Sequence, residues 1–337
     1  MRFALSTEQL DFAAELRKIL DAGQVPAAVR AWSAGDTDKG RALLRQLAEM
    51  GVFGLIVDEK YDGADATPVD LVVALIETGR AALPGPVIES AAVIPALLQR
   101  LPDAGPAQRW LPGLAGGASL GTITFDVPQR AVALDAETAE VVLTAAAGAL
   151  AVGTVASGES GGATDPAAIG PRQSIDPARK LFRVGTGETV AAEVQDALDY
   201  AFDIGVLACA AQLLGAGRAI LEQTTTYAKQ RKQFGRVIGE FQAVKQQLAD
   251  VLIALDLAEP LVYRAALTLD SADRARDVSA ALVACGDAAH RAARVGLQVH
   301  GAIGYTAECD LSLWLTRVTA LRTAWGTADF HRGRVAA

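Results

Sequence analysis

Aromatic residues are scarce in this sequence of 337 residues: Phe, Trp and Tyr together make up 5%, whereas hydrophobic residues make up 51%. Ala and Leu dominate the apolar content, and both are strong helix formers. Ala also lets helices approach each other closely. The composition therefore favours long packed helices over a β-sandwich, in a chain long enough for two or three sub-domains.

The sequence also lacks an excess of positive charge. Its net charge is −8 and its isoelectric point is about 5.0, so no basic face indicates a nucleic-acid partner. A phosphate-bearing ligand would need locally placed Arg residues, because the overall field repels it. Only three cysteines are present, without the spacing of metal ligands, which predicts free thiols and no metal site: Cys209, Cys285 and Cys309.

No apolar signal core follows Met1, because the chain runs directly into an amphipathic pattern. No uninterrupted apolar stretch is long enough to cross a bilayer. We therefore predict a soluble, cytoplasmic protein with no membrane partner.

Residues 1–118 are predicted to form a helical domain. Ser6 and Gln9 have the spacing of a capping box, and Thr67 followed by Pro68 is a typical helix start. The predicted helices cover about residues 6–20, 39–50, 68–79 and 87–101, with Pro95 as a kink or boundary of the fourth.

Residues 119–195 contain short β-rich runs separated by Gly, Pro, Ser and Asp, for example Gly121–Phe125 and Val141–Thr144. Such runs predict a small antiparallel sheet or barrel. Residues 157–162 are rich in Ser and Gly and could form a phosphate loop. Because they do not clearly open a helix, a flexible surface turn is the favoured interpretation.

Residues 196–337 return to a helical pattern. Four long helices are predicted at about residues 197–229, 240–269, 279–299 and 308–322, the second kinked at Pro260, and together they indicate a four-helix bundle. The fold class is therefore mainly α with a small central β domain, in the order helices, sheet, bundle.

Two motifs carry the most chemical information. The first is Tyr227–Gly235 (YAKQRKQFG), followed by Phe241-Gln242, and the second is Gln298–Thr306 (QVHGAIGYT). An Arg in the first motif offers a planar fork of donors suited to a pyrophosphate, and glycines in the second let the backbone approach a ligand. The alternative is a surface ion pair at Arg231 and an ordinary helix C-cap at Gly301.

The motifs resemble the R-x-Q-F-G…F-Q and Q-x-x-G-G-x-G-[FY] signatures of the acyl-CoA dehydrogenase family, and the helix–sheet–bundle order extends the resemblance over nearly the whole chain. The resemblance implies FAD, an acyl-CoA substrate and an electron-transfer acceptor. It also implies residues that reach across a subunit interface to the ADP half of the flavin of a neighbouring chain: Arg231, Gln233, Phe234, Phe241, Gln242, Gln298, Gly301 and Ala302.

The sequence departs from the family where the flavin ring is held. Family members have a T-E-P-x-x-G-S-D segment at the start of the sheet, whereas residues 122–128 here read TITFDVP and lack the Glu, Gly and Ser. The sheet region is also short for the family. These departures predict that the chain has no complete flavin-ring site of its own.

The catalytic base is missing as well. In the family a carboxylate removes the α-proton of the acyl-CoA while the β-hydrogen leaves as hydride to the flavin. One family position for this Glu is occupied by Trp325, in the turn Ala324–Thr327, and the alternative position by Gly205. Neither residue can accept a proton, so no catalytic residue is predicted in this chain.

Asp203 matches a substrate-contacting Asp of the family. A substrate contact or a helix-surface role is favoured for it over a role as proton acceptor, and Val206 replaces an Arg found nearby in some members. The three histidines, His290, His300 and His331, are predicted to be structural, because no paired carboxylate is visible near them.

The chain thus resembles the base-less subunit of heteromeric acyl-CoA dehydrogenases from actinobacterial steroid-degrading organisms. The resemblance implies an α2β2 heterotetramer with a homologous chain that carries the Glu, acting on a bulky acyl-CoA, with a steroid-derived thioester as one candidate. Two alternatives stay open: a flavin-dependent monooxygenase on the same fold, which the lost flavin-ring segment disfavours, and a non-catalytic scaffold or regulatory subunit, which the two retained motifs disfavour.

Overall fold

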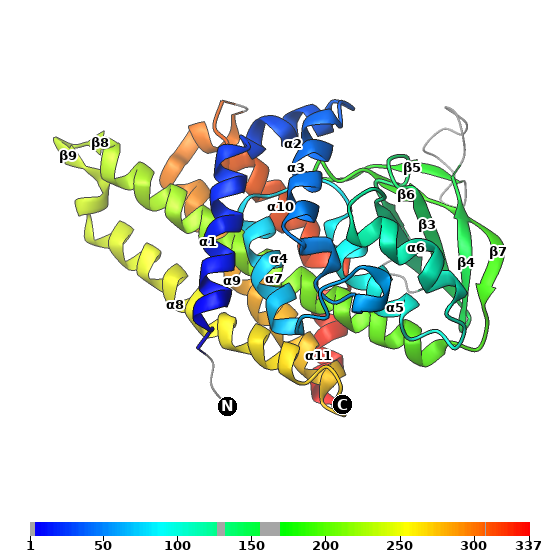
Figure 1. Ribbon diagram of the computed structural model, residues 1–337. Helices are drawn as coiled ribbons and strands as arrows, with labels where there is room; N and C mark the ends of the chain where they lie inside the picture. The colour runs from blue at the N-terminus through cyan, green and yellow to red at the C-terminus, as the bar shows by residue number, and fades with distance from the viewer. Residues whose placement is uncertain (1–3, 127–131, 156–168, 307) are drawn as a thin grey trace.

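The structure is a computed structural model that describes residues 4–126, 132–155, 169–306 and 308–337. Helices come first, strands follow from Gly121 to Ala191, and helices return at Gln195 (Figure 1). The prediction of a mainly α protein with a small β region between two helical parts is confirmed. The predicted domain limits stay predictions, and the predicted turn at residues 157–162 lies outside the described residues.

Local capping signals start two of the N-terminal helices. The Ser6 hydroxyl accepts a hydrogen bond from the Gln9 amide at 3.2 Å, and the Gln9 side chain accepts one from the Ser6 amide at 3.0 Å. Thr67 and Asp70 form the second capping box, so both helix starts are confirmed. The elements of this part are α1 (Thr7–Ala22), α2 (Val25–Ser33), α3 (Asp38–Glu49), η1 (Val52–Gly54), η2 (Glu59–Tyr61), α4 (Pro68–Arg80), η3 (Glu89–Val93), α5 (Ile94–Leu98) and α6 (Gly105–Ala115).

The helix predicted over residues 87–101 is divided. Its first part, η3, is a π-helix, and α5 begins immediately before Pro95. Pro95 therefore marks a boundary, as predicted, because proline is tolerated in the first turn of a helix but not in its interior. The sequence did not predict α2 and α6.

The strands form a mixed arrangement: β1 (Gly121–Phe125), β2 (Ala133–Leu134), β3 (Val141–Ala146), β4 (Ala149–Thr154), β5 (Gly170–Arg172), β6 (Leu181–Arg183) and β7 (Gly185–Ala191). One sheet has the order β1-β3-β4-β7 and the other β2-β6-β5. The expectation of a purely antiparallel sheet is wrong at β1 and β3, which pair in parallel. Between β1 and β3 the chain crosses to the other sheet through β2. Because of this crossover, β3 runs in the same direction as β1.

The C-terminal part contains α7 (Gln195–Gln230), β8 (Lys232–Gln233), β9 (Arg236–Val237), η4 (Ile238–Glu240), α8 (Gln242–Leu267), α9 (Arg274–His300), η5 (Gly301–Tyr305), α10 (Leu311–Ala324) and α11 (Ala328–Ala336). The four predicted helices correspond to α7–α10, α8 continues through Pro260, and α11 was not predicted. Helix α7 has 36 residues and is about 54 Å long. A Cβ added at Gly215 would lie 1.9 Å from Ile76 O, so only a glycine permits this close crossing of α7 and α4.

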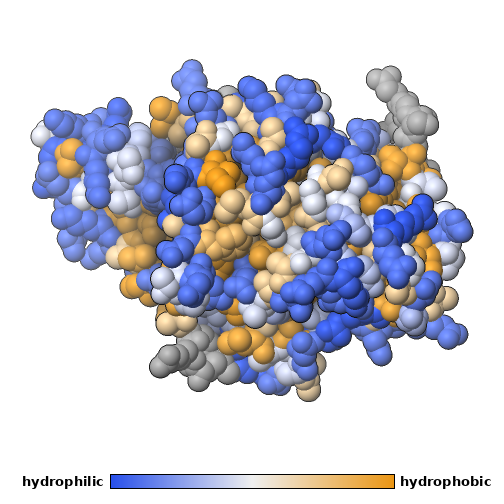
Figure 2. Space-filling model, viewed as in Figure 1, coloured by the Kyte–Doolittle hydropathy of each residue, from blue (hydrophilic) through white to orange (hydrophobic). Residues whose placement is uncertain are grey.

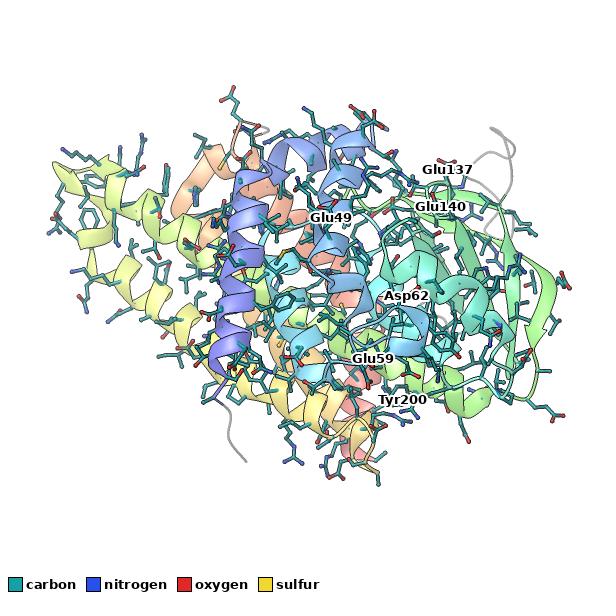
Figure 3. All side chains as sticks on the ribbon, viewed as in Figure 1. Glu49, Glu59, Asp62, Glu137, Glu140 and Tyr200 are labelled. Atoms are coloured by element: carbon teal, nitrogen blue, oxygen red, sulfur yellow. The ribbon has the colours of Figure 1, made fainter. Side chains whose placement is uncertain are left out.

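Ion pairs connect the sheets to the N-terminal helices and to the C-terminal helices. Buried Arg317 of α10 donates to Asp176 at 2.5 Å and to the Leu83 carbonyl at 2.7 Å. At the boundary seen in Figure 3, Glu140 accepts hydrogen bonds from Arg41 of α3 at 3.1 Å and from the Leu120 amide at 2.7 Å. These bonds fix the position of the sheets relative to α10 and α3.

Helix α7 is also long and apolar enough to cross a membrane by length and composition alone. Of its most apolar window, 89% is buried inside the protein, as in the core helix of a water-soluble protein. The predicted cytoplasmic location stays a prediction.

Candidate functional site

The first motif forms a projecting hairpin at the C-terminal end of α7. Gln233 and Arg236 pair across a two-residue turn in which Phe234 has φ +52° and Gly235 has φ +80°. Positive φ at both central residues is the requirement of a type I′ turn, which suits a tight hairpin. The turn holds the Phe234 ring 91% exposed to solvent.

The base of this hairpin is ordered by its own side chains. The ring of Phe241 lies 6.2 Å from that of Phe234 in an edge-to-face arrangement, and the Arg236 guanidinium lies 4.2 Å from the Phe241 centroid. The Ile238 amide donates to the Arg231 carbonyl at 2.8 Å. The hairpin is therefore a defined platform, although it projects from the rest of the molecule (Figure 1).

The second motif ends α9 beside the first. The imidazole of His300 stacks on the ring of Tyr227 at 4.2 Å with an interplanar angle of 20°, which joins the ends of α9 and α7. Its Nδ1 lies 2.8 Å from the Gly296 carbonyl and donates to it. Gly301 follows with φ +65° as the C-cap of α9. His300 thus has a structural role, and it brings the two motifs to one end of the molecule.

The predicted flavin contacts offer donors and open space. Among the described residues, no carboxylate lies within 4.0 Å of the Arg231 guanidinium, so the alternative of a surface ion pair is not supported. A Cβ added at Gly235 or Gly301 would meet nothing within 4 Å. Phe241 is half-buried, and the other predicted contacts are exposed: Arg231, Gln233, Phe234, Gln242, Gln298, Gly301 and Ala302. We call these eight residues the half-site. The Arg231 guanidinium and the glutamine amides of the half-site suit a pyrophosphate, and the exposed Phe234 ring suits the heterocycle of a dinucleotide.

The two predicted base positions meet in space. A Cβ added at Gly205 would lie 2.2, 2.5 and 2.5 Å from three carbon atoms of the Trp325 ring. Trp325 is fully buried. The Trp325 indole therefore fills the space that a side chain at position 205 would need.

Two phenylalanines pack on this indole and a third packs on one of them. Together the four rings form the aromatic cluster: Phe125 of β1, Phe202 of α7, Trp325 and Phe330 of α11. The ring centroids of Phe125 and Phe202 each lie 5.9 Å from that of Trp325, and Phe330 lies 6.3 Å from Phe202. Such edge-to-face and tilted contacts stabilise a cluster beyond its buried area. A packed apolar core therefore lies at the two positions where the sequence predicted that the catalytic Glu is missing.

His331 holds the turn that carries the indole. Its Nε2 donates to the Trp325 carbonyl at 2.7 Å, so its Nδ1 accepts from the Ser279 hydroxyl at 3.0 Å. Burial lowers the pKa of His331, which favours this neutral form. A Cβ at Gly326, whose φ is +111°, would lie 2.4 Å from His331 Nε2. His331 is therefore a structural residue, as predicted.

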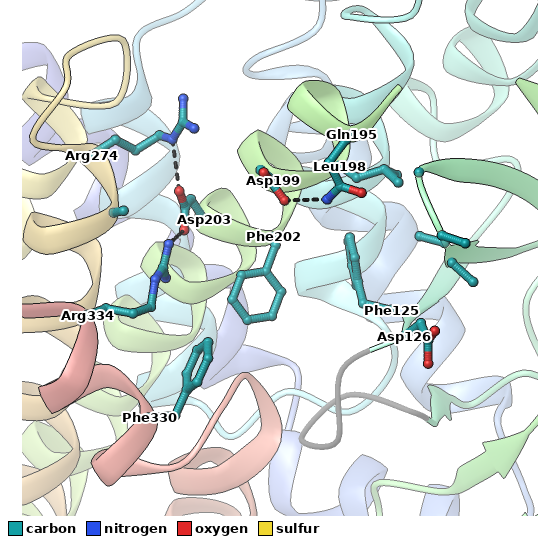
Figure 4. Close-up of a pocket in the computed structure, with 15 residues that line it drawn as sticks. Phe125, Asp126, Gln195, Leu198, Asp199, Phe202, Asp203, Arg274, Phe330 and Arg334 are labelled. Carbon is teal, nitrogen blue, oxygen red and sulfur yellow. Dashed lines mark hydrogen bonds and ion pairs between the residues drawn. The ribbon is translucent and has the colours of Figure 1, made fainter. Parts of the chain in front are cut away.

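Asp203 lies on the wall of a cavity of about 350 Å³ whose apolar side is formed by Phe125, Phe202 and Phe330 (Figure 4). Both oxygens of its carboxylate are engaged: Arg274 donates to Oδ2 at 2.8 Å and Arg334 donates to Oδ1 at 2.5 Å. These bonds connect α7 with α9 and α11. The substrate contact predicted for Asp203 stays a prediction. In the structure the Asp203 carboxylate joins three helices through its two arginine partners.

The two arginines that bind Asp203 could not be predicted from the sequence. Nothing in the local pattern relates Arg274 and Arg334 to Asp203, because the three lie on different helices. A second cavity of about 560 Å³ beside the half-site, lined by Arg80, Tyr227 and His300 among others, was also not predicted.

Comparisons with known proteins agree with this architecture. The model of the acyl-CoA dehydrogenase N-terminal domain matches residues 6–118, and that of the acyl-CoA dehydrogenase C-terminal domain matches residues 196–337. The acyl-CoA dehydrogenase IpdE2 of Mycobacterium tuberculosis is 32% identical over 293 residues, which cover 87% of this chain and 85% of that protein. The chain belongs to the acyl-CoA dehydrogenase family.

Solved structures show the same fold. The ChsE4–ChsE5 complex from Mycobacterium tuberculosis matches with a TM-score of 0.85 at 23% identity, over 100% of this chain and 98% of that one. A variant of the Tcur3481–Tcur3483 steroid ACAD matches with a TM-score of 0.80 at 21% identity, over 98% and 96%. The predicted family and its enzyme class, oxidoreductases that act on CH–CH bonds, are confirmed. The individual contact residues stay predictions.

Proposed function

We propose that this chain is the base-less subunit of a heteromeric, FAD-dependent acyl-CoA dehydrogenase, and that its half-site binds the ADP half of a flavin whose ring lies on a homologous partner chain. The observation that carries the proposal is the contact of the Trp325 indole with Gly205. The indole fills the space at both of the positions where the resemblance places the Glu of a family member. The half-site, in contrast, is exposed and equipped with donors.

The residues fit one half of the cofactor and not the other. At the half-site, Arg231 can donate a charge-assisted fork to a pyrophosphate, and Phe234 can pack on a heterocycle. Beside β1, the described part of the segment that departs from the family's flavin-ring motif, residues 122–126, lacks the motif's Glu. Residues 127–128 of the segment that departs from the family's flavin-ring motif lie outside the described residues. FAD, when bound, accepts the hydride that the substrate loses. This chain's part is to bind and orient the end of the cofactor remote from that transfer.

The partner would supply the carboxylate that removes the α-proton. The substrate class we propose is a bulky acyl-CoA, with a steroid-derived thioester as the first candidate, and the electrons would pass to an electron-transfer protein. The similarity to a steroid ACAD and to the ChsE4–ChsE5 complex supports this choice. The lost flavin-ring segment also disfavours a monooxygenase, which would need a complete flavin-ring site in its own chain.

The test is the flavin content of the chain alone and in complex with a homologous chain that carries the Glu and the flavin-ring segment. We expect the chain alone to be colourless and inactive with acyl-CoA esters, and the complex to be an α2β2 tetramer with two flavins. Mass is measured by light scattering and flavin by absorbance. A yellow preparation of the chain alone that reduces an electron acceptor with an acyl-CoA would refute the proposal, as would four flavins per tetramer.

A further inference from the structure

The loop between β5 and β6 carries a buried arginine. Asp176 attaches this loop to the helices, because its Oδ2 accepts a hydrogen bond from Arg317 of α10, and its Oδ1 accepts one from the Ala178 amide at 3.0 Å. The Arg179 amide donates to the Asp176 carbonyl at 2.9 Å, and Pro177 restricts the backbone between them. The fold therefore fixes the position of Arg179, of which only 5% is exposed.

The guanidinium of Arg179 has neither a hydrogen-bond acceptor nor a carboxylate within 4.0 Å among residues 4–126, 132–155, 169–306 and 308–337. The carboxylate of Asp135 interacts with it only over a longer distance: burial raises the pKa of Asp135, and Arg179 acts in the opposite direction. Asp135 Oδ1 accepts instead from the Trp32 indole and the Lys180 amide. Buried charges are normally paired and hydrogen-bonded, because burial removes the water that would solvate them. Within the described part of the chain, the donors of Arg179 thus lack the acceptor that their burial requires.

Arg179 also lines a cavity of about 230 Å³ at this edge of the sheets, which is large enough for several water molecules or one small oxyanion. Five further polar residues line it: Glu137, Arg172, Ser174, Asp176 and Lys180. The rest of its wall is apolar, and Figure 2 shows both hydrophilic and apolar surface at this edge. Glu137 is exposed and lies at the upper edge of the sheets in Figure 3. The cavity therefore connects the buried guanidinium with the solvent.

The side chains of this cavity carry an excess of positive charge. Three of them are cationic: Arg172, Arg179 and Lys180. Of the two lining carboxylates, Asp176 is neutralised by Arg317, so only Glu137 opposes an anion. The Ser174 hydroxyl accepts from the Asp176 amide at 3.2 Å, which leaves its own hydrogen to donate. The protein as a whole has a net charge of −8, so this group of cations is a local exception to its overall field and suits an anion with more than one negative charge.

We propose that this cavity binds a phosphate group, with Arg179 as its principal ligand and Lys180 and Ser174 as further donors. A guanidinium offers a planar fork that binds two oxygens of a phosphate at once, and a phosphate dianion matches the surplus of cations. The group is inorganic phosphate or the phosphate end of an ester, whose organic part extends along the apolar wall. In Figure 1 the edge formed by β5 and β6 and the hairpin of the half-site lie at opposite ends of the molecule, so the two sites can be tested separately.

The full chain is titrated with sodium phosphate at constant ionic strength, with sodium chloride as the reference salt, and binding is followed by calorimetry and by the melting temperature. We expect one phosphate per chain and a melting temperature that rises with the logarithm of the phosphate concentration, because a ligand of the native state stabilises it by mass action. Arg179→Gln removes the charged fork and should weaken binding about ten- to a hundredfold. Arg45→Gln on α3 makes the same change of charge at an exposed position and should bind phosphate like the natural chain.

Two further titrants identify the source of the phosphate group. Coenzyme A and dephospho-coenzyme A differ by one phosphate monoester. Coenzyme A that binds at least about tenfold more tightly than its dephosphorylated form, with the difference lost in Arg179→Gln, would show that the site takes the phosphate of an ester. Equal binding of the two compounds, or none, together with retained binding of inorganic phosphate, would show that the free ion is the ligand.

Lys180→Gln keeps the test decisive if Arg179→Gln does not give a folded chain by circular dichroism, because Lys180 is only partly buried. It should weaken phosphate binding about tenfold. A phosphate response no larger than that of chloride would overturn the proposal. Equal binding by the natural chain and by folded Arg179→Gln, or by Lys180→Gln where that variant has to replace it, would overturn it too. Either result would mean that water alone solvates the Arg179 guanidinium.

Discussion

Gly205→Ala tests whether the Trp325 ring fills the space beside Gly205, one of the two positions proposed to correspond to the family's Glu. The added methyl carbon would lie 2.2–2.5 Å from three ring carbons, and carbon atoms in contact normally stay about 3.5–4.0 Å apart, so the ring would have to move by about 1–1.5 Å. It has little freedom to do so, because Phe125 and Phe202 pack against it and His331 holds its carbonyl. Overpacking of this kind costs about 1–3 kcal/mol.

Gly286→Ala on α9 is the matched control. A Cβ there would meet only Arg322 Cγ, at 3.8 Å, so the new methyl group fits. Alanine is more favourable than glycine in a helix interior by about 0.8–1.0 kcal/mol, and both variants gain this stabilisation. We therefore expect Gly286→Ala to raise the free energy of unfolding and Gly205→Ala to lower it, with the two variants separated by about 1–3 kcal/mol.

Urea unfolding of the purified chain, followed by circular dichroism, measures this separation, which corresponds to roughly 1–4 °C in melting temperature for a chain of this size. Replacing the indole in the same chain, as Gly205→Ala with Trp325→Leu, should remove most of the clash and make the two changes non-additive. Equal stabilisation by Gly205→Ala and Gly286→Ala would refute the packing argument, because it would mean that the space beside α7 is free.

Three further outcomes are expected. Arg231→Ala should weaken flavin retention of the assembled complex about ten- to a hundredfold, since a charge-assisted hydrogen bond is worth about 1.5–3 kcal/mol, whereas Arg45→Ala on α3 should change nothing in the same dialysis experiment. Burial raises the pKa of Asp135 to about 6, so the native state keeps a proton that the unfolded chain has lost above about pH 4. Stability should therefore fall by up to about 3 kcal/mol between pH 4 and pH 6 in denaturant unfolding, and a fall of the same size in Asp135→Asn would contradict this origin. Asp176→Ala should destabilise the chain by about 3–5 kcal/mol because it leaves the guanidinium of Arg317 buried without its carboxylate, and a loss below 1 kcal/mol would show that water reaches the pair.

The parts of the fold that could be predicted are those specified by neighbouring residues. The capping boxes at Ser6 and Thr67 and the apolar periodicity after them gave the starts of α1 and α4. The N-cap of helix α2 is instead Gln24, which is in a left-handed conformation and makes no side-chain capping bond, and the N-cap of α6, Ala104, makes none either. Both are short, so their stability comes from packing against other elements rather than from local signals.

The site divides in the same way. The positions of the two motifs at helix ends could be predicted because each motif is contiguous in the sequence, whereas their contacts with a flavin stay a prediction. The contact between Gly205 and Trp325 could not be predicted, because 120 residues separate them and their meeting depends on how α10 and α11 pack on α7. The parallel pairing of β1 with β3 is of the same kind, since it follows from a crossover that local β propensity does not encode.

Helix α7 carries the Gly205 end of the aromatic cluster near its beginning and the half-site at its C-terminal end. Gly205 and Arg231 are 26 residues apart, which places them about 39 Å from each other along the axis, with buried helix between them. Sites so far apart, with no side chain in common, respond to substitution independently. Natural selection can therefore act on each end separately: the chemistry at one end can decay in a duplicated subunit while the other end is maintained by its usefulness to a different protein.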